Sequence, residues 1–283
     1  MSVEQGILRK GIGGFYYVEA AGQVHECKAR GAFRKQGIRP MAGDRVRISV
    51  EPQGCSLEEI LPRKNALTRP PLANLDQLFL VASVCEPAPN ARILDKMIAV
   101  AEEKGIEPIV VLSKADLGDC APWQELYGKA GIRCVATSSA TGQGVQEIRA
   151  LLTGKLSAFS GNSGVGKSTL LNALGEGYAL ETAAISQKLG RGRHTTRQVE
   201  LLPLREGGYV ADTPGFSTVD IERYDLVNKE RLPFAFREFA PYLGQCKFPS
   251  CAHRCEKGCA VLAAVERGDI SASRYQSYAA MYD

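Results

Sequence analysis

The fold class of this chain is decided by the stretch Gly161-Asn162-Ser163-Gly164-Val165-Gly166-Lys167-Ser168-Thr169. The stretch matches the phosphate-loop pattern G-x-x-x-x-G-K-[ST] and lies between a strand-like segment, 156–160, and a helix-like segment, 169–174. Its glycines let successive backbone N–H groups turn toward the β- and γ-phosphates of a nucleotide. Lys167 adds a positive charge there, and Ser168 offers a hydroxyl to Mg²⁺. The stretch therefore predicts a nucleoside-triphosphate site in an α/β domain.

A second motif, Ser113-Lys114-Ala115-Asp116, follows the apolar segment 108–112 and is typical of a guanine-reading loop. A carboxylate at Asp116 accepts hydrogen bonds from N1–H and N2–H₂ of guanine, whereas adenine has an acceptor at N1 and no N2 amine. Lys114 can lie over the base and brace the phosphate loop. After the next predicted strand, the backbone of Ser138-Ser139-Ala140 can contact the guanine O6. These residues predict GTP as the nucleotide.

The motif Asp212-Thr213-Pro214-Gly215 follows another strand-like segment and predicts further contacts to Mg²⁺ and the phosphates. Asp212 can hold Mg²⁺, usually through water, and Gly215 can donate its N–H to the γ-phosphate. The base-reading motif therefore precedes the phosphate loop, and the Asp212 motif follows it. In most GTPases the phosphate loop comes first and the base reader comes late, so this order indicates a circular permutation.

A basic, glycine-flanked segment, 190–197, lies between the phosphate loop and the Asp212 motif. One of its threonines, Thr195 or Thr196, can complete the Mg²⁺ shell when the γ-phosphate is present. We therefore expect a loop that orders with GTP and relaxes after hydrolysis. The alternative is a simple surface loop.

From about residue 70 the chain alternates between apolar runs and amphipathic segments. The continuous apolar run 77–84 is typical of a strand buried on both faces. Residues 93–104 predict an amphipathic helix ended by Gly105, and 108–112 predict the next strand. The alternation predicts a parallel sheet with helices on both faces.

The N-terminal region shows a different pattern, in which short apolar segments are separated by glycine- and proline-containing turns. The segments are 15–18, 23–27 and 45–50, and they predict a small β-barrel of the OB type. Because neighbouring strand residues alternate between the two faces, we expect at least one of Tyr16 and Tyr17 to point into the barrel.

The excess positive charge is N-terminal: residues 1–69 hold 12 Lys and Arg against 7 Asp and Glu, in a chain whose net charge is +4. Basic and aromatic residues interleave there, as on a nucleic-acid surface. The alternative is a solvated basic face without a partner. No apolar run approaches the roughly 18 residues that a membrane span requires, and the first residues lack a signal-peptide pattern. We therefore expect a cytoplasmic protein without a membrane partner.

Four of the nine cysteines crowd together near the C-terminus, which favours a metal site over a disulfide framework. The spacing Cys246-x₄-Cys251-x-His253-x₅-Cys259 supplies thiolate and imidazole donors suited to tetrahedral Zn²⁺. Four protein ligands would close the shell, so the expected zinc is structural. Cys255 is a further thiol within reach, and local spacing leaves it open as a ligand. Around this cluster the chain reads as mostly helical, with a helix predicted over 260–267.

In the order of these motifs and in its three segments, the chain resembles the RsgA family of circularly permuted GTPases that depend on the small ribosomal subunit. The resemblance implies an RNA-binding OB-type barrel over 1–67, a permuted α/β P-loop GTPase domain over 68–222 and a mostly helical zinc-binding domain over 223–283. It implies Mg²⁺-dependent hydrolysis of GTP to GDP and phosphate in late maturation of the small subunit, stimulated by that subunit. The implied partners are the subunit and its rRNA, and the implied state is a monomer.

Two residues depart from common GTPase patterns. Ser113 stands where Asn is usual, which leaves a shorter side chain to contact the base and the neighbouring loops. Phe216 stands where many GTPases carry a catalytic Gln, and a phenyl ring cannot orient water. In the RsgA family a His in the preceding segment is the candidate substitute, and His194 matches that position. A structural or phosphate-side His is the alternative. Of the two threonines in that segment, we assign Thr196 to Mg²⁺.

Two other functions fit parts of the pattern. A P-loop ATPase or kinase would share the phosphate loop, but Asp116 argues against it. An RNA-binding factor could use the nucleotide site only as a structural latch, and the substitution Lys167→Ala would distinguish that factor from a GTP-driven switch.

Overall fold

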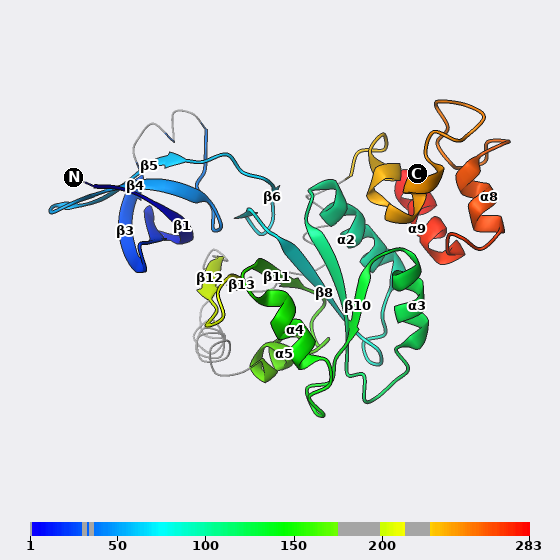
Figure 1. The fold of residues 1–283 in the computed structure, drawn as a ribbon, viewed down its shortest axis with the longest axis horizontal. Helices are drawn as coiled ribbons and strands as arrows, with labels where there is room; N and C mark the ends of the chain where they lie inside the picture. The colour runs from blue at the N-terminus through cyan, green and yellow to red at the C-terminus, as the bar shows by residue number, and fades with distance from the viewer. Residues whose placement is uncertain (1, 30–32, 34–36, 175–198, 213–226) are drawn as a thin grey trace. The chain divides into compact units, whose positions relative to one another are not determined.

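The computed structural model describes residues 2–29, 33, 37–174, 199–212 and 227–283 (Figure 1). They form two compact units, each built from separate stretches of the chain. One comprises Met1–Gln77, Arg149–Phe159 and Leu174–Phe216, and the other comprises Leu78–Ile148, Ser160–Ala173 and Ser217–Asp283. None of the helices in the described part of the chain has the length and apolar character of a membrane span.

The first unit contains a closed five-stranded barrel in the order β1-β2-β3-β5-β4 (Figure 1). Its strands are β1 (Ser2–Ile12), β2 (Phe15–Ala20), β3 (Gln23–Ala29), β4 (Arg45–Glu51) and β5 (Gly54–Ile60). Neighbouring strands run antiparallel except β3 and β5, which are parallel and share a short register. The predicted barrel is thus confirmed, although the sequence patterns indicated neither β1 nor β5.

The barrel core consists of inward side chains that alternate along these strands, with Leu8, Val18, Val46, Ile48 and Leu57 fully buried. Tyr16 packs against this core, whereas the hydroxyl of Tyr17 donates a hydrogen bond to Glu26 on the neighbouring strand. The prediction that at least one of these two tyrosines faces inward is confirmed.

The first unit also holds a short hairpin and half of the α/β region. The hairpin is β6 (Ala66–Leu67) with β7 (Leu72–Ala73), and the three further strands are β11 (Leu156–Ser160), β12 (Glu200–Pro203) and β13 (Tyr209–Asp212). β13 is parallel to β11 and antiparallel to β12. The expectation of a purely parallel sheet is therefore wrong at β12, because the short connection to β13 can only return the chain antiparallel.

The second unit contains three strands in the order β10-β9-β8, covered by helices. The strands are β8 (Gln77–Ser83), β9 (Glu107–Ser113) and β10 (Arg133–Ala136), and the helices are α2 (Ala91–Glu103), α3 (Ala121–Lys129) and α5 (Lys167–Ala173). A further helix, α4 (Val145–Leu152), begins in this unit and ends in the first. Every residue of β8 is buried, as its continuous apolar sequence predicts. α2 corresponds to the helix predicted over 93–104. It begins directly after Asn90, whose side chain accepts the N–H of Ile93 as an N-cap.

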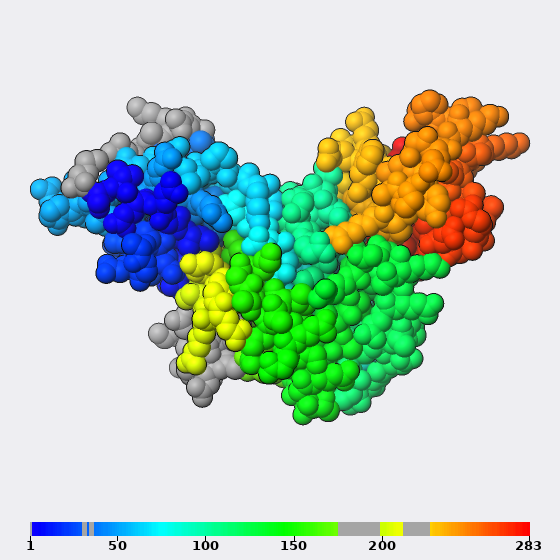
Figure 2. Space-filling view, in the orientation of Figure 1, coloured from blue at the N-terminus to red at the C-terminus, as the bar shows by residue number. Residues whose placement is uncertain are grey.

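The C-terminal part of the second unit is mostly helical. It comprises the short 3₁₀ helices η1 (Leu232–Ala235) and η2 (Arg237–Tyr242), followed by α8 (Ala260–Glu266) and α9 (Ala272–Tyr282). Its apolar core includes Phe236, Phe239 and Tyr278 and also takes in Ala99 of α2. In Figure 2 the orange atoms of this C-terminal part lie directly against the teal atoms of the same unit.

A buried ionic network joins α9 to α2. The Arg274 guanidinium donates to Asp95 on α2 at 2.8 Å and to Glu238 on η2 at 2.7 Å. The side chains are 1%, 0% and 5% exposed, respectively, and the guanidinium also lies 4.6 Å from the ring centre of Phe236. The C-terminal helices are therefore held on α2 by a charged contact that is shielded from water.

Candidate nucleotide site and metal centre

The phosphate loop follows β11 and leads into α5. Gly161 has φ of +155°, and a Cβ atom there would lie 2.3 Å from the carbonyl oxygen of Val81. Gly166 has φ of +92°, which also favours glycine. The backbone path of the loop therefore depends on glycine at both positions.

Lys167, the first residue of α5, folds back over this loop. Its Nζ donates to the carbonyl oxygens of Gly161 and Asn162, at 2.5 and 2.8 Å. Burial lowers the pKa of the Lys167 ammonium. An anion beside Nζ would favour the charged form, so the arrangement suits a phosphate group.

Ser113 links the predicted base-reading loop to the phosphate loop. Its buried hydroxyl donates to the carbonyl oxygen of Val165 at 2.5 Å and lies 3.3 Å from that of Ala82. Ser113 therefore still joins the two loops by a hydrogen bond, which is one of the two roles expected of the Asn that is usual at this position.

The rest of the base-reading loop is held by backbone contacts. Lys114 adopts φ of +57°, and its Nζ donates to the carbonyl oxygen of Glu86. The N–H of Ala115 donates to the carbonyl oxygen of Thr137 at 3.0 Å, which places this loop beside the predicted O6 contact. Asp116 is exposed, so its carboxylate is free to meet a ligand from solvent.

The segment Ser138-Ser139-Ala140 forms a turn after β10. The hydroxyl of Ser138 is buried and accepts the N–H of Thr141 at 3.2 Å, whereas Ser139 and Ala140 are exposed. The structure thus brings the phosphate loop, the base-reading loop and this turn together in one unit.

The predicted magnesium and switch residues are only partly described. Ser168 is exposed on α5 next to Lys167. Asp212 is the last residue of β13, whose Ala211 is paired with Ala158 of the parallel strand β11. The remaining predicted residues, His194, Thr195, Thr196 and Gly215, lie outside the described residues.

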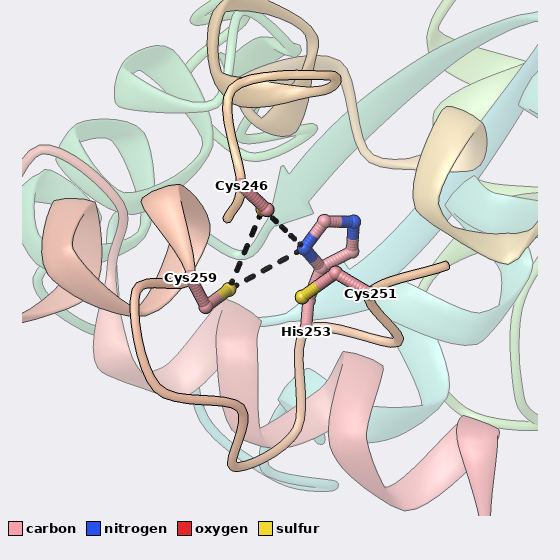
Figure 3. Close-up of side chains that lie close together, drawn as sticks. All are labelled: Cys246, Cys251, His253 and Cys259. Atoms are coloured by element: carbon pink, nitrogen blue, oxygen red, sulfur yellow. Dashed lines mark hydrogen bonds between the residues drawn. The ribbon is translucent and has the colours of Figure 1, made fainter. Parts of the chain in front are cut away.

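The four predicted zinc donors converge in the C-terminal part of the second unit (Figure 3). One ligand atom from each of Cys246, Cys251, His253 and Cys259 lies within 4.8 Å of all the others. Nδ1 of His253 is 3.5 Å from the Cys246 sulfur and 3.4 Å from that of Cys259. The exposed Cys255 does not belong to this group.

The chemistry of the group fits a thiophilic metal. Burial lowers the pKa of His253, which favours the neutral imidazole that ligates metals. Backbone N–H groups of Ala260 and Leu262 donate to the sulfurs of Cys246 and Cys259, at 3.3 and 3.5 Å. Burial raises the pKa of the Cys259 thiol, and the N–H of Leu262 acts against that effect by favouring the thiolate.

Sequence patterns did not reveal the residues that hold this metal-binding loop. The carboxylate of Glu256 accepts the backbone N–H groups of Ala252, Arg254 and Cys255, which lowers its pKa to about 2 despite the opposing effect of burial. The Tyr275 hydroxyl donates to the carbonyl oxygen of His253 at 3.0 Å. A Glu within a Cys-rich segment is a weak signal, because only the folded loop brings three N–H groups to one carboxylate.

Two family models match the chain. The RsgA GTPase model matches residues 60–222, and the RsgA N-terminal domain model matches residues 5–56. Among curated proteins, the chain is 48% identical over 279 residues to the small ribosomal subunit biogenesis GTPase RsgA of Caldanaerobacter subterraneus, covering 97% of this chain and 93% of that protein.

Solved structures agree with these matches. The fold is similar to YjeQ from Thermotoga maritima, with a TM-score of 0.85 and 36% identity, covering 99% of this chain and 98% of that one. It is also similar to YloQ, described as a circularly permuted GTPase, with a TM-score of 0.81 and 32% identity, covering 99% and 94%.

Proposed function

Because the chain belongs to the RsgA family of GTPases, we propose that its GTP hydrolysis serves late maturation of the small ribosomal subunit. The observation that supports a guanine-nucleotide site most directly is the hydrogen bond from Ser113 to Val165, which joins the base-reading and phosphate loops in one unit. The curated relative carries small-subunit biogenesis in its name, and we extend that role to this chain.

We assign the site residues as follows. The nucleotide is held by the phosphate loop and by the two loops beside it: Gly161, Asn162, Ser163, Gly164, Val165, Gly166, Lys167, Ser168 and Thr169, with Ser113, Lys114, Asp116, Ser138, Ser139 and Ala140. Mg²⁺ would be held by Ser168, Thr196 and Asp212, with Thr195 and Gly215 near the γ-phosphate. His194 would orient the attacking water.

In this mechanism the protein acts mainly by positioning and by charge. Backbone N–H groups and Lys167 stabilise the negative charge that develops on the phosphate oxygens during transfer to water. Bound Mg²⁺ supplies further neutralisation of that charge. Phe216 provides no group to position water, so intrinsic turnover should be slow, and docking on the subunit would complete the arrangement around His194.

The other parts of the chain supply the partner contacts in this proposal. The barrel, within 1–67, would bind rRNA, the region 68–222 would hydrolyse GTP, and 223–283 would hold one structural Zn²⁺ through Cys246, Cys251, His253 and Cys259. The N-terminal excess of positive charge supports the rRNA contact. We propose that the protein works as a cytoplasmic monomer.

Purified small subunits should raise the rate of GTP hydrolysis by at least about tenfold, because they complete a catalytic arrangement that the free protein lacks. Phosphate release is measured during a titration with small subunits, with large subunits as the control and ATP as the competing substrate. An unchanged rate across the titration would contradict the proposed partner. Equal hydrolysis of ATP would contradict the guanine site.

The substitution Asp116→Asn should weaken GTP binding by about a hundredfold, because one bidentate base contact is worth roughly 1–3 kcal/mol. The amide can instead donate to the 2-carbonyl of xanthine, so binding of XTP should improve. Affinities for both nucleotides are measured by fluorescent-analogue competition, with the nearby exposed Asp119→Asn as control. Parallel losses for GTP and XTP would show that Asp116 does not read the base.

The substitution Glu256→Gln should weaken zinc binding by about tenfold, because the groups that orient metal ligands typically contribute 10–100-fold. The amide keeps the size of the side chain but loses the charge and one acceptor for the three N–H groups of the loop. Competition with a chromophoric chelator measures the affinity in the full chain. The control is Glu266→Gln on the exposed face of α8, and equal affinities for the two variants would refute the role of Glu256.

A further inference from the structure

Two cysteines outside the metal-binding group meet inside the barrel. Cys27 on β3 and Cys55 on β5 are directly paired in the parallel register of these strands. Paired strands lie about 4.7–4.9 Å apart, within the Cα separation of about 4.4–6.8 Å that disulfides require. Both side chains belong to the barrel core or pack against it, so they share the inner face.

A histidine and a carboxylate stand beside this pair. Nδ1 of His25 lies 3.7 Å from the Cys55 sulfur, and Nε2 of the same ring lies 3.8 Å from Oε2 of Glu4 on β1. That Glu4 oxygen is buried and has no hydrogen-bond partner. The carboxylate can therefore stabilise the imidazolium that would form if His25 took a proton from Cys55.

The two thiols differ in their surroundings. Cys27 is fully buried, and its burial together with the neighbouring Cys55 raises its pKa to about 12. Cys55 is only partly buried and faces His25. Cys55 is therefore suited to react first, since the thiolate is the nucleophilic form. Cys27 is placed to attack the product because it lies directly opposite Cys55 in the strand register.

We propose that Cys27 and Cys55 form a reversible disulfide across the β3–β5 seam when the protein meets a hydroperoxide, with His25 as the base that starts the reaction. Cys55 gives its proton to His25, and its sulfur attacks one peroxide oxygen. The S–O bond forms as the O–O bond breaks, and the leaving oxygen takes the proton from His25. The product at Cys55 is a sulfenic acid.

The Cys27 sulfur then attacks the Cys55 sulfur. The S–S bond forms, the S–O bond breaks, and the departing hydroxide leaves as water with the proton of Cys27. Two thiols have lost two electrons, and the peroxide has gained them. Among the residues that the structure describes, the β3–β5 seam is the one parallel pairing of the barrel and has three paired positions, so the bond would join the two strands where their pairing is shortest.

The test uses the full-length, zinc-loaded protein with hydrogen peroxide. After alkylation of free thiols, trypsin releases two peptides, 11–28 and 48–63, which contain Cys27 and Cys55 as their only cysteines. We expect these peptides to appear linked by mass spectrometry, at a mass two hydrogens below their sum, and to separate on reduction. Cys55→Ser should abolish the linked species. Oxidation of Cys55 without linkage, or linkage of either residue to the metal-binding cysteines, would overturn the proposal.

The role of His25 is tested by the rate. His25→Ala should slow formation of the linked peptides by about tenfold or more, in line with the contribution of a general base. The control is Val24→Ala at an exposed neighbouring position on β3, and His25→Gln serves if the alanine variant fails to fold. If the linked peptides formed at equal rates in the His25 and Val24 variants, His25 would not act as the base.

Discussion

Replacing Lys167 with alanine should lower kcat/KM for GTP hydrolysis by about a thousandfold, the upper range for removal of one preorganised electrostatic contact. Nζ of Lys167 lies over the phosphate loop, where it donates to the carbonyl oxygens of Gly161 and Asn162. In the proposed complex it would turn to the phosphates, and an alanine side chain cannot supply that charge.

The measurement is single-turnover phosphate release, with and without small subunits. Lys96→Ala is the control, because Lys96 is a half-buried lysine on α2 in the same unit. RNA binding by the Lys167 variant should stay at the level of the control. If the variant lost hydrolysis but still supported subunit maturation, the nucleotide site would be a structural latch and the switch would be refuted.

Replacing Arg274 with alanine should lower the free energy of unfolding of its unit by about 3–5 kcal/mol, because it leaves Asp95 and Glu238 buried without a counter-charge. Burial raises the pKa of Asp95 even with Arg274 present. Protonation of Asp95 removes the uncompensated charge, so the loss should be smallest at acidic pH and should grow as the pH rises through the range in which Asp95 ionises.

The chain offers a local probe for this experiment. Trp123 is the only tryptophan and stacks on Tyr127, the two ring centres lying 6.3 Å apart. Its fluorescence during urea denaturation, at pH 5 and pH 7.5, reports on the unit that contains Asp95. The control is Arg267→Ala, which breaks an exposed pair with Asp269 and should cost less than about 1 kcal/mol. Equal losses for both arginines would contradict a buried network.

The local motifs could be predicted because their chemistry depends on residue type at short spacing. Three motifs are local in this sense: within the phosphate loop, within Ser113–Asp116 and within the Cys246–Cys259 cluster, the functional residues lie close together in the sequence. The continuous apolar runs of β8 and β9 likewise indicate buried strands. The order of the motifs along the chain also indicated the permuted fold. The roles of individual site residues stay predictions until the experiments above are made.

Strand β1 shows why other elements could not be predicted. Its sequence, Ser-Val-Glu-Gln-Gly-Ile-Leu-Arg-Lys-Gly-Ile, does not alternate regularly between apolar and polar residues, and only Leu8 is buried along its length. The strand forms because it pairs with both β2 and β4 to close the barrel. Pairing with a strand that is distant in the chain leaves no pattern in the local sequence. The sequence of β1 therefore did not indicate a strand.

The fold class, the family resemblance and the candidate donors for nucleotide and metal follow from the amino-acid sequence alone, because each depends on short-range spacing and periodicity. Which distant groups meet depends on how the chain packs in three dimensions. In the sequence nothing distinguishes Arg274 from a surface arginine. In the folded protein its guanidinium contacts Asp95, which is 179 residues away in the chain. Likewise, Ser113 contacts Val165 across 52 residues, and Cys27 meets Cys55 through strand pairing. Packing places these groups together, and burial then sets their charge and reactivity.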